Sequence, residues 1–488
     1  MIRYITSMFI LSATLICAQS PTNELTLENT IQQAKRTSPD AQTARHSFRS
    51  EYWNYKYFQA NYLPSLTLSS DPYLNRAINK VTMSDGTVKF VEQNLLSTDL
   101  ALTLTQNILW TGGSLFVETD VQRMDMLNDK VTSWQTSPIT VGYRQSLFGY
   151  NSLKWDKRIE PIRYREARKN YVETLELVAA RATNMFFALA VAQSNYDIAS
   201  FNYATADTLY RFAQGRYSIG TITENEMLQL EINKLTEETK QINARIEVDD
   251  CMQNLRSYLG IQDDVELKVL VDEQVPDFIV NLPEALALAR QNSPDILNMQ
   301  RRKLQSESSV AQAKANAGLK ADVYLRFGLT QTGSKLKQAY ENPLEQQYVT
   351  LGLSLPILDW GRGKGRVRVA RSQRDLVYTQ VDQDKTDFEL NIRKLVKQFN
   401  LQAQRVKIAA CTDETAQRRH DVARRLYILG KSTILDLNAS ISEKDSARRA
   451  YINTLHNYWS LYYTLRSITL YDFEHNTEIV TNIDELIK

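Results

Sequence analysis

Residues 171–220 read YVETLELVAARATNMFFALAVAQSNYDIASFNYATADTLYRFAQGRYSIG, and this stretch decides the fold. From Tyr171 to Tyr217, apolar and aromatic residues recur in alternating steps of four and three without a break. One seam carries alanine at positions 192, 199, 206 and 213, and the other carries tyrosine at 196, 203, 210 and 217. Such heptads predict a coiled coil in which small residues allow close approach and rings fill the space between. A helix over about 155–217 would be about 90 Å long, so it cannot fit inside a compact globule.

The second half of the chain repeats the first. The pattern at Leu27–Asp40 returns roughly 255 residues later at Leu282–Asp295, and Tyr217–Gly220 returns roughly 210 residues later at Tyr427–Gly430. A second heptad helix is expected over about 364–429, although Gln402, Asp413 and His420 place polar groups in its seam. The two offsets predict two homologous halves, with about 45 extra residues in the first.

Both long helices are expected to end in the same kind of hairpin. Gly220 and Gly430 stand where a left-handed C-terminal cap belongs. Three residues later, Thr223 with Glu226 and Thr433 with Asp436 form capping-box patterns that start a new helix. Return helices should then run to about residues 259 and 470.

Between the helices lie runs with an apolar residue at every second position. Alternation over about ten residues is typical of a barrel wall with lipid outside and water inside, and a half-buried soluble sheet has the same period. The long rods and the export signal described below favour the barrel. The runs are 66–68, 100–104, 117–121, 139–145, 323–329 and 349–355.

One pair of these runs accounts for the extra residues. Residues 105–113 (TQNILWTGG) resemble the corner between strand and helix at 145–149, but a strand-like run follows them. Gly112-Gly113 is a turn signal, so we expect an inserted hairpin with strands near 100–109 and 114–124 and its tight turn facing the periplasm. Glu118 and Asp120 must then face the lumen. Each chain would then give four strands from its first half and two from its second. In a trimer, which the family resemblance given below implies, this would make about 18 strands where that resemblance implies about 12.

The N-terminus has the pattern of an export signal. Arg3 precedes an apolar run that ends at Ile16-Cys17-Ala18, which predicts a signal peptide over residues 1–18. Acylation of Cys17 is the alternative, although Ile16 is larger than a lipobox prefers. The net charge is +2 from 58 basic and 56 acidic residues, which gives no electrostatic footprint for nucleic acid. Cys251 and Cys411 form no disulfide framework.

No pattern for catalysis or for a cofactor is present in the sequence. The four histidines lie far apart, without the spacing of metal ligands. Residues 361–366 (GRGKGR) superficially resemble a phosphate loop but lack its spacing, and a basic cluster at a membrane interface is the simpler interpretation. We therefore expect no enzyme, no metal and no cofactor.

Together these features resemble the TolC-type outer-membrane efflux proteins. The resemblance covers nearly the whole mature chain and includes the two repeats, the tips at 216–220 and 425–430, and the corners at 145–149 (QSLFG) and 355–361 (LPILDWG). It implies a mixed α+β membrane protein, in which a homotrimer forms one transmembrane β-barrel continued by an α-helical coiled-coil tunnel. It also implies a passive exit duct in the outer membrane, docked to a periplasmic membrane-fusion adaptor and an inner-membrane transporter. The alternative is an exported periplasmic coiled-coil adaptor or scaffold without a barrel.

The same resemblance assigns roles at the tips. It places Asp436, Glu226 and Tyr427 at a periplasmic gate, and helix capping alone is the alternative for the two acids. Ser432 replaces the basic residue of the family's bridge, and Ala439 replaces the second acid of its ring. The expected adaptor-docking residues are Arg216, Tyr217, Gly220, Arg425 and Gly430.

The expected organisation follows from these elements. After the signal peptide, a first repeat covers 19–264, a linker 265–281, a second repeat 282–470 and a C-terminal tail 471–488. The first repeat should contain two helices, strands over about 63–148, the long helix over about 155–217, a tip at about 218–223 and a return helix to about 259. The second should contain helices at 283–318, strands at about 320–357, the long helix over about 364–429, a tip at about 430–433 and a return helix to about 470.

Overall fold

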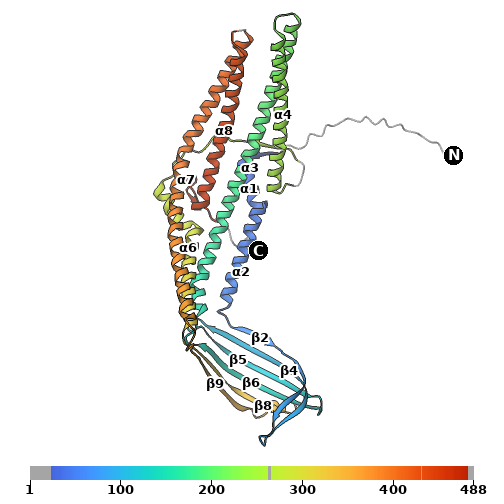
Figure 1. Cartoon of the computed structure of the whole chain (residues 1–488), viewed down its shortest axis with the longest axis vertical. Coiled ribbons are helices and arrows are strands. Elements are labelled where there is room, and N and C mark those ends of the chain that lie inside the picture. The colour runs from blue at the N-terminus through green and yellow to red at the C-terminus, as the bar shows by residue number, and fades with distance from the viewer. Residues whose placement is uncertain (1–22, 262–264, 430, 482–488) are drawn as a thin grey trace, which may run out of the picture.

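The computed structural model describes residues 23–261, 265–429 and 431–481. The expected signal peptide, Cys17 and Gly430 lie outside the described residues, as do the side chains of Tyr427 and Ile428. The molecule is a long rod of helices with a curved sheet at one end (Figure 1). Long helices therefore set its length, and the chain folds as a mixed α+β protein.

Two pairs of long helices form the rod. α3 (Ser152–Ser218) and α7 (Arg362–Ile428) each contain 67 residues, or about 100 Å of helix. Each is followed by a return helix of 36 residues, α4 (Glu224–Leu259) and α8 (Ile434–Thr469) respectively. In the tip half the helices lie side by side, with α7 and α4 at the two edges and α8 next to α3 (Figure 1).

Shorter helices complete the half of the rod nearer the sheet. α1 (Leu27–Thr37) and α2 (Pro39–Ala60) precede the sheet in the first repeat, and α5 (Leu282–Asn292) and α6 (Pro294–Ala317) do so in the second. Ser38 and Ser293 each end one helix and cap the next, because the following proline excludes a helical conformation at the serine. The same local rule thus produces the same break in both repeats, and the chain is internally duplicated.

The heptad seam of α3 lies where the sequence predicts. The four seam alanines, Ala192, Ala199, Ala206 and Ala213, are all buried. The tyrosines at 196, 203 and 210 are only half-buried, and Tyr217 is exposed. The alanine seam therefore packs within one chain, whereas the tyrosine rings remain partly uncovered.

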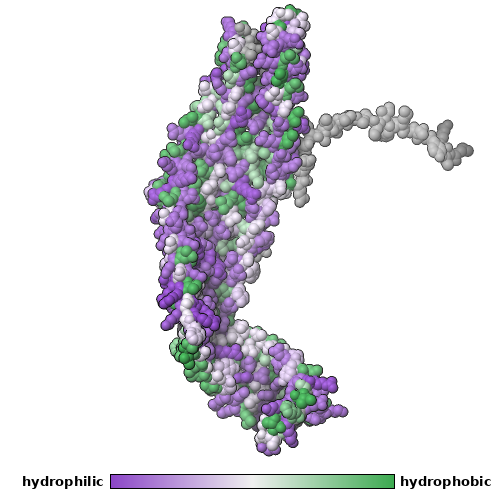
Figure 2. Space-filling model, in the orientation of Figure 1, coloured by the Kyte–Doolittle hydropathy of each residue, from purple (hydrophilic) through white to green (hydrophobic). Residues whose placement is uncertain are grey.

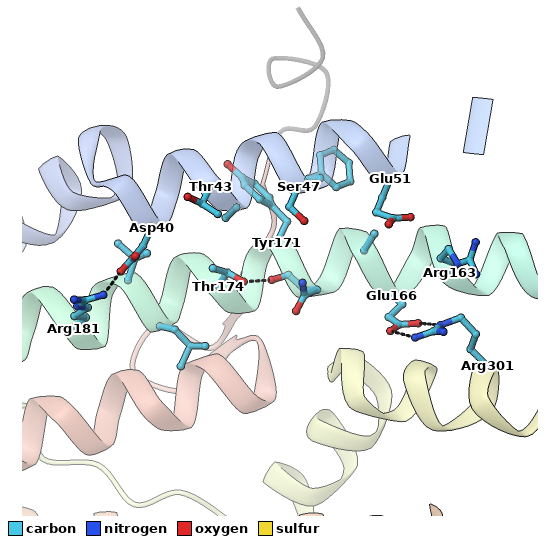
Figure 3. Close-up of a pocket in the computed structure, with 16 residues that line it drawn as sticks. Asp40, Thr43, Ser47, Glu51, Arg163, Glu166, Tyr171, Thr174, Arg181 and Arg301 are labelled. Carbon is cyan, nitrogen blue, oxygen red and sulfur yellow. Dashed lines mark hydrogen bonds and ion pairs between the residues drawn. The ribbon is translucent and has the colours of Figure 1, made fainter. Parts of the chain in front are cut away.

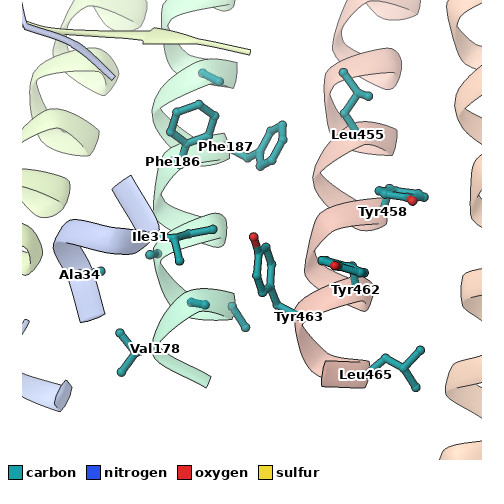
Figure 4. Close-up of a cluster of buried hydrophobic side chains, with 14 of the residues drawn as sticks. Ile31, Ala34, Val178, Phe186, Phe187, Leu455, Tyr458, Tyr462, Tyr463 and Leu465 are labelled. Carbon is teal, nitrogen blue, oxygen red and sulfur yellow. The ribbon is translucent and has the colours of Figure 1, made fainter. Parts of the chain in front are cut away.

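The core is at the middle of the rod, where the two repeats meet. Figure 4 shows Phe186 and Phe187 of α3 facing aromatic side chains of α8, including Tyr463. Beside them, the buried Glu176 carboxylate binds Lys35 at 2.6 Å and Arg466 at 2.8 Å. Of the described helices, only α3 includes a segment long and apolar enough to cross a membrane, and more than half of that segment is buried here.

Short strands tie this region together. β1 (Asn23–Thr26) pairs in parallel with β7 (Leu267–Leu270). β10 (Tyr471–Asp472) and β11 (Thr477–Glu478) form a small antiparallel pair after α8. Neither pairing is predicted by the sequence, because four-residue and two-residue strands carry no measurable alternation.

The sheet at the end of the rod is antiparallel, in the order β2-β4-β5-β6-β8-β9, with β3 also paired to β4. The inserted hairpin is confirmed, since residues 114–124 lie within β5, between β4 and β6. β4 begins at Val88, about a dozen residues before the predicted strand, and pairs there with the unpredicted β3. The bounds are β2 (Ser65–Ser69), β3 (Tyr73–Thr82), β4 (Val88–Ile108), β5 (Gly113–Met126), β6 (Val131–Ser146), β8 (Lys320–Gly333) and β9 (Leu344–Ser354), with a 3-10 turn η1 (Gln338–Tyr340) between the last two.

Candidate functional site

The first tip is a tight, self-contained turn between α3 and α4. Gly220 adopts a φ of +73°, which a β-branched side chain would resist. The carbonyl of Arg216 accepts a hydrogen bond from the Thr221 amide at 2.9 Å. Thr223 and Glu226 then form a capping box, in which the Thr223 amide donates to Glu226 Oε2 at 2.9 Å. The Glu226 carboxylate therefore has a local structural partner.

The second tip is built on the same plan. The Asp436 amide donates to Thr433 Oγ1 at 3.2 Å and the Thr433 amide donates to Asp436 Oδ2 at 3.3 Å, which completes a second capping box. The Thr433 hydroxyl also donates to Asp436 Oδ2, at 2.7 Å. The Ser432 hydroxyl also donates to Asp436 Oδ2, at 3.3 Å. These hydrogen bonds favour the charged form, so the pKa of Asp436 lies below its ordinary value. Asp436 is thus a carboxylate at neutral pH.

The structure does not bring the two tips into contact. Within the described residues, Glu226 and Asp436 hydrogen-bond only inside their own turns. The side chains of Arg216 and Arg425 are exposed at the two hairpins. The tips therefore offer separate charged ends, and both tip acids act as helix caps in this chain.

The two hairpins are instead joined farther from the tips. Asn202 of α3 donates to Asp445 Oδ2 of α8 at 2.8 Å. Next to this pair, Lys444 lies 4.7 Å from the centre of the Phe201 ring, and the His420 ring of α7 packs edge-on against the same phenylalanine. The heptad pattern indicated His420 as a polar seam residue but did not indicate Asn202, Lys444 or Asp445, whose contacts join distant parts of the chain.

Unpartnered polar atoms surround this joint. Oδ1 of Asn202 and Nε2 of His420 are buried without a hydrogen-bond partner, and Oδ1 of Asp445 has an ion pair with Lys444 at 3.6 Å but no hydrogen bond. His420 Nδ1 lies 3.3 Å from Ser440 Oγ, and burial together with Lys444 lowers the pKa of His420. A cavity of about 650 Å³ between α3, α4 and α8 adjoins Asn202 and Asp445. Such a polar cavity suits water.

The sheet has one polar and one apolar face. Arg326 of β8 lies 3.2 Å from Glu118 and 3.5 Å from Asp120, so the two acids of the inserted hairpin are on the polar face, as expected. On the same face, the Phe116 ring covers Gly142, where any Cβ would collide with it. The opposite face carries exposed apolar side chains, which are Leu66, Leu68, Leu100, Leu102, Leu104, Leu115, Val141, Phe327, Val349, Leu351 and Leu353.

The corners between sheet and helices are rigid and apolar outside. Asn151 caps α3, accepting from the Lys154 amide at 3.0 Å, and donates to the carbonyl of Leu109 at 3.0 Å in the turn of the inserted hairpin. Trp110 and Trp360 are each 88% exposed at these corners. Figure 2 shows apolar surface gathered at this bend. Exposed tryptophans beside an apolar band are typical of a membrane–water interface.

The described pockets hold no arrangement of reactive groups. One of them, about 790 Å³ between α2, α3 and α6, is lined by apolar residues and by charged residues, several of which form ion pairs (Figure 3). Arg301 binds both oxygens of Glu166, and Arg181 binds Asp40 at 2.7 Å. These ion pairs brace the helices.

One cluster of ionisable residues outside these pockets has a structural role. Asp472, Glu474 and His475 lie together, yet Asp472 already accepts from Tyr462 at 2.7 Å and from Arg466 at 2.7 Å. Cys251 and Cys411 are free thiols.

Comparison with known proteins agrees with this architecture. No curated protein sequence matches the chain significantly. Three similar solved structures are the CmeC outer membrane channel of Campylobacter jejuni, VceC of Vibrio cholerae and the open state of the MtrE channel of Neisseria gonorrhoeae. CmeC is 16% identical with a TM-score of 0.68, over 95% of this chain and 89% of CmeC. VceC is 12% identical with a TM-score of 0.63, over 93% of this chain and 97% of VceC. MtrE is 13% identical with a TM-score of 0.61, over 93% of this chain and 91% of MtrE.

A family profile also matches most of the chain. The outer membrane efflux protein family matches residues 30–261 and 285–469, which covers both repeats. With the duplicated helices, the capped tips and the two-faced sheet, this match assigns the protein. The chain belongs to the outer membrane efflux protein family.

Proposed function

We propose that three copies of this chain assemble one exit duct, in which a shared β-barrel continues into a shared helical tunnel. Family membership makes the protein a non-enzymatic transport duct of the outer membrane, with its helices in the periplasm. The observation that carries the trimeric barrel is a sheet that is open at both edges and carries a band of exposed apolar side chains on one face. The apolar side chains of such a sheet are stabilised by contact with lipid, and the backbone groups at its two edges need further strands as hydrogen-bond partners.

The two edges of the sheet suit each other. β9 is an edge strand of 11 residues whose side chains are almost all exposed. At the other edge, β2 and β3, of 5 and 10 residues, follow each other along β4 and present enough backbone to pair with all of β9. Pairing β9 of one copy with β2 and β3 of the next would satisfy both rows of backbone groups and close the barrel.

The helical rod has matching edges as well. α4 carries an exposed heptad stripe of Leu228, Ile232, Leu235, Ile242 and Ile246. α7, at the opposite edge of the chain, exposes Leu401, Ile408, Val422 and Leu426 at similar spacing. Packing α4 of one copy against α7 of the next would bury both stripes in a coiled-coil seam.

The tips are the end of the duct that meets the transport machinery. We assign the adaptor-docking role to Arg216, Tyr217, Gly220, Arg425 and Gly430, and a gating role to Asp436, Glu226 and Tyr427. Support comes from two capped hairpins with exposed charges at the free end of the rod. Docking there of a periplasmic membrane-fusion adaptor, itself bound to a proton-driven or ATP-driven inner-membrane transporter, would let cargo pass outward without any chemistry in the duct.

The test compares two substitutions on neighbouring positions of β9. Leu351→Arg places a charge on the face assigned to lipid and should abolish heat-modifiable trimers in the outer-membrane fraction, because such a charge costs about 2–4 kcal/mol per copy. Thr350→Arg, on the polar face, is the matched control and should leave trimers and single-channel currents in planar bilayers. A soluble wild-type protein without currents would instead support a periplasmic scaffold.

A further inference from the structure

Each chain supplies six strand positions to the proposed barrel wall, and this number sets the width of the barrel. The order is β2 with β3, then β4, β5, β6, β8 and β9. We propose that the trimer closes an 18-stranded barrel with an open, porin-wide bore, so that the helical end of the duct, and not the barrel, sets the size limit of the cargo. This inference rests on the trimeric duct proposed above.

The inserted hairpin is part of the wall along its whole length. β5 pairs with β4 from Ile108↔Gly113 to Leu95↔Met126, and with β6 from Ser114↔Arg144 to Met126↔Val131. A single register shift, between Glu118 and Asp120, interrupts the second ladder. Strands that are bonded on both sides cannot lie inside or outside the barrel as a separate plug.

The side chains of the inserted hairpin alternate between the polar and the apolar face of the sheet. In β5, Glu118 and Asp120 reach Arg326 across β6, on the polar face. In β4, the Thr103 hydroxyl donates to Glu118 Oε2 at 3.2 Å on that face, whereas the adjacent Leu102 is exposed on the apolar face. The hairpin therefore continues the same lumen and the same lipid surface as its neighbours.

The turn of the hairpin is anchored to the rod. Asn151, the cap of α3, donates to the carbonyls of Leu109 and Trp110, and a Cβ added at Gly112 would meet the Asn151 side chain. The extra strands are thus held at the mouth of the helical tunnel. They widen the wall at the point where cargo would enter the barrel.

Nothing in the described wall fills the enlarged bore. The connections between wall strands are short, and the longest, residues 334–343, includes the turn η1 beside β8. On the polar face, Arg326 pairs with Glu118 and Asp120 along the wall. Barrel diameter grows roughly linearly with strand number, so 18 strands give about 1.5 times the diameter of 12, in the range where porins hold an aqueous channel.

The helical part carries no matching insertion. In the tip half each chain contributes α3, α4, α7 and α8, so a trimer contributes twelve helices there. The barrel would therefore be wider than in a 12-stranded duct, whereas the helical tunnel would not, and the duct would differ in width between its two ends. Solutes that pass the tips would meet no second size filter in the barrel.

Polymer exclusion on the full-length protein in planar bilayers tests this asymmetry. Polyethylene glycols of increasing size, added from the barrel side, should lower single-channel conductance up to a radius about 1.5 times that expected of a 12-stranded barrel. From the tip side the cut-off should be smaller. Equal cut-offs from both sides, at the size of a 12-stranded barrel, would overturn the inference while leaving the duct intact.

Three further variants keep the test decisive. Deleting residues 88–126 removes β4 and β5 and leaves β3 and β6 joined at the same end of the sheet, so the barrel-side cut-off should fall to about two-thirds while the tip-side cut-off stays unchanged. Should that variant fail to fold, Thr103→Cys and Leu102→Cys address the same point in the whole chain. A membrane-impermeant thiol reagent should reduce current through the Thr103→Cys channel and not through the Leu102→Cys channel. Equal reaction at both would place the hairpin outside the wall, and absence of any current or trimer in wild type would reject the duct itself.

Discussion

Asn202 of α3 donates a hydrogen bond to Oδ2 of Asp445 in α8 at 2.8 Å, and this pair joins the two helical hairpins. Between it and the tips, no hydrogen bond or ion pair of the described residues crosses from one hairpin to the other. Ser432, which is expected from the sequence to stand at the position of the family's basic bridge residue, donates a hydrogen bond to Asp436 in its own turn. The connection between hairpins thus lies inside the rod.

Removing the acid of this pair should loosen the tunnel. We expect Asp445→Ala to raise leak conductance in bilayers and to lower the free energy of unfolding by about 1–3 kcal/mol, because the Asn202 side chain loses its partner. Asp445→Asn keeps an acceptor oxygen and is the matched control. Unchanged leak in the alanine variant would show that the hairpins are held elsewhere.

Charge reversal at Asp436 and Glu226 tests whether these acids gate the channel or only cap their helices. Asp436→Lys and Glu226→Lys should raise leak conductance and weaken block by multivalent cations, because each removes a negative charge from the end of the tunnel. The capping boxes would be lost as well, at a cost of about 1 kcal/mol each. Asp436→Asn and Glu226→Gln keep hydrogen-bond acceptors without the charge. If export and conductance match wild type in the lysine variants, both acids are caps only.

The turn at Gly220 depends on its backbone conformation. Its φ of +73° should make Gly220→Val cost about 1 kcal/mol or more, although the space around the site is open. We expect faster amide exchange over residues 216–226 and weaker capture of the adaptor. Gly215→Ala lies inside α3 with equally open surroundings and ordinary helical geometry, so it should be neutral or slightly stabilising. Equal effects of the two substitutions would contradict this explanation.

Glu173 of α3 should make stability depend on pH. Burial, and secondarily the nearby Asp295, raise the pKa of Glu173 from 4.5 to about 7 in the folded chain. Between these values the folded state holds a proton that the unfolded chain has lost, so stability falls as pH rises from about 4.5 through 7. Glu173→Gln should therefore stabilise the protein by about 2 kcal/mol at pH 8 and by almost nothing at pH 4. Thermal unfolding at the two pH values measures the difference, and a gain independent of pH would refute it.

Helix periodicity made most of the rod predictable. The alanine seam of α3 is buried as expected, and the polar residues that interrupt the second seam have partners on α8. Gln402 donates to the Thr454 carbonyl, Asp413 accepts from Arg448, and His420 contacts Ser440. Heptad rules identify such positions but do not name their partners, because a partner on another helix depends on axial register.

The parts that were missed are those whose pattern is weak or whose partner is distant. The hairpin of β3 and β4 alternates poorly, yet Asp85-Gly86 in its turn, where Gly86 has a φ of +81°, is a hairpin signal that could have revealed it. The Asn202–Asp445 pair joins residues 243 positions apart, and local periodicity contains no information on such a contact.

The parallel pairing of β1 with β7 has a consequence for the order in which the chain folds. Asn23 pairs with Leu267, so a strand from the beginning of the chain waits for a partner that follows the entire first repeat. Contacts so distant form late, since the loop between them must be ordered first. During export the start of the chain would thus emerge early and be secured only after the first hairpin has been delivered, which leaves an interval in which periplasmic chaperones have an unpaired strand to hold.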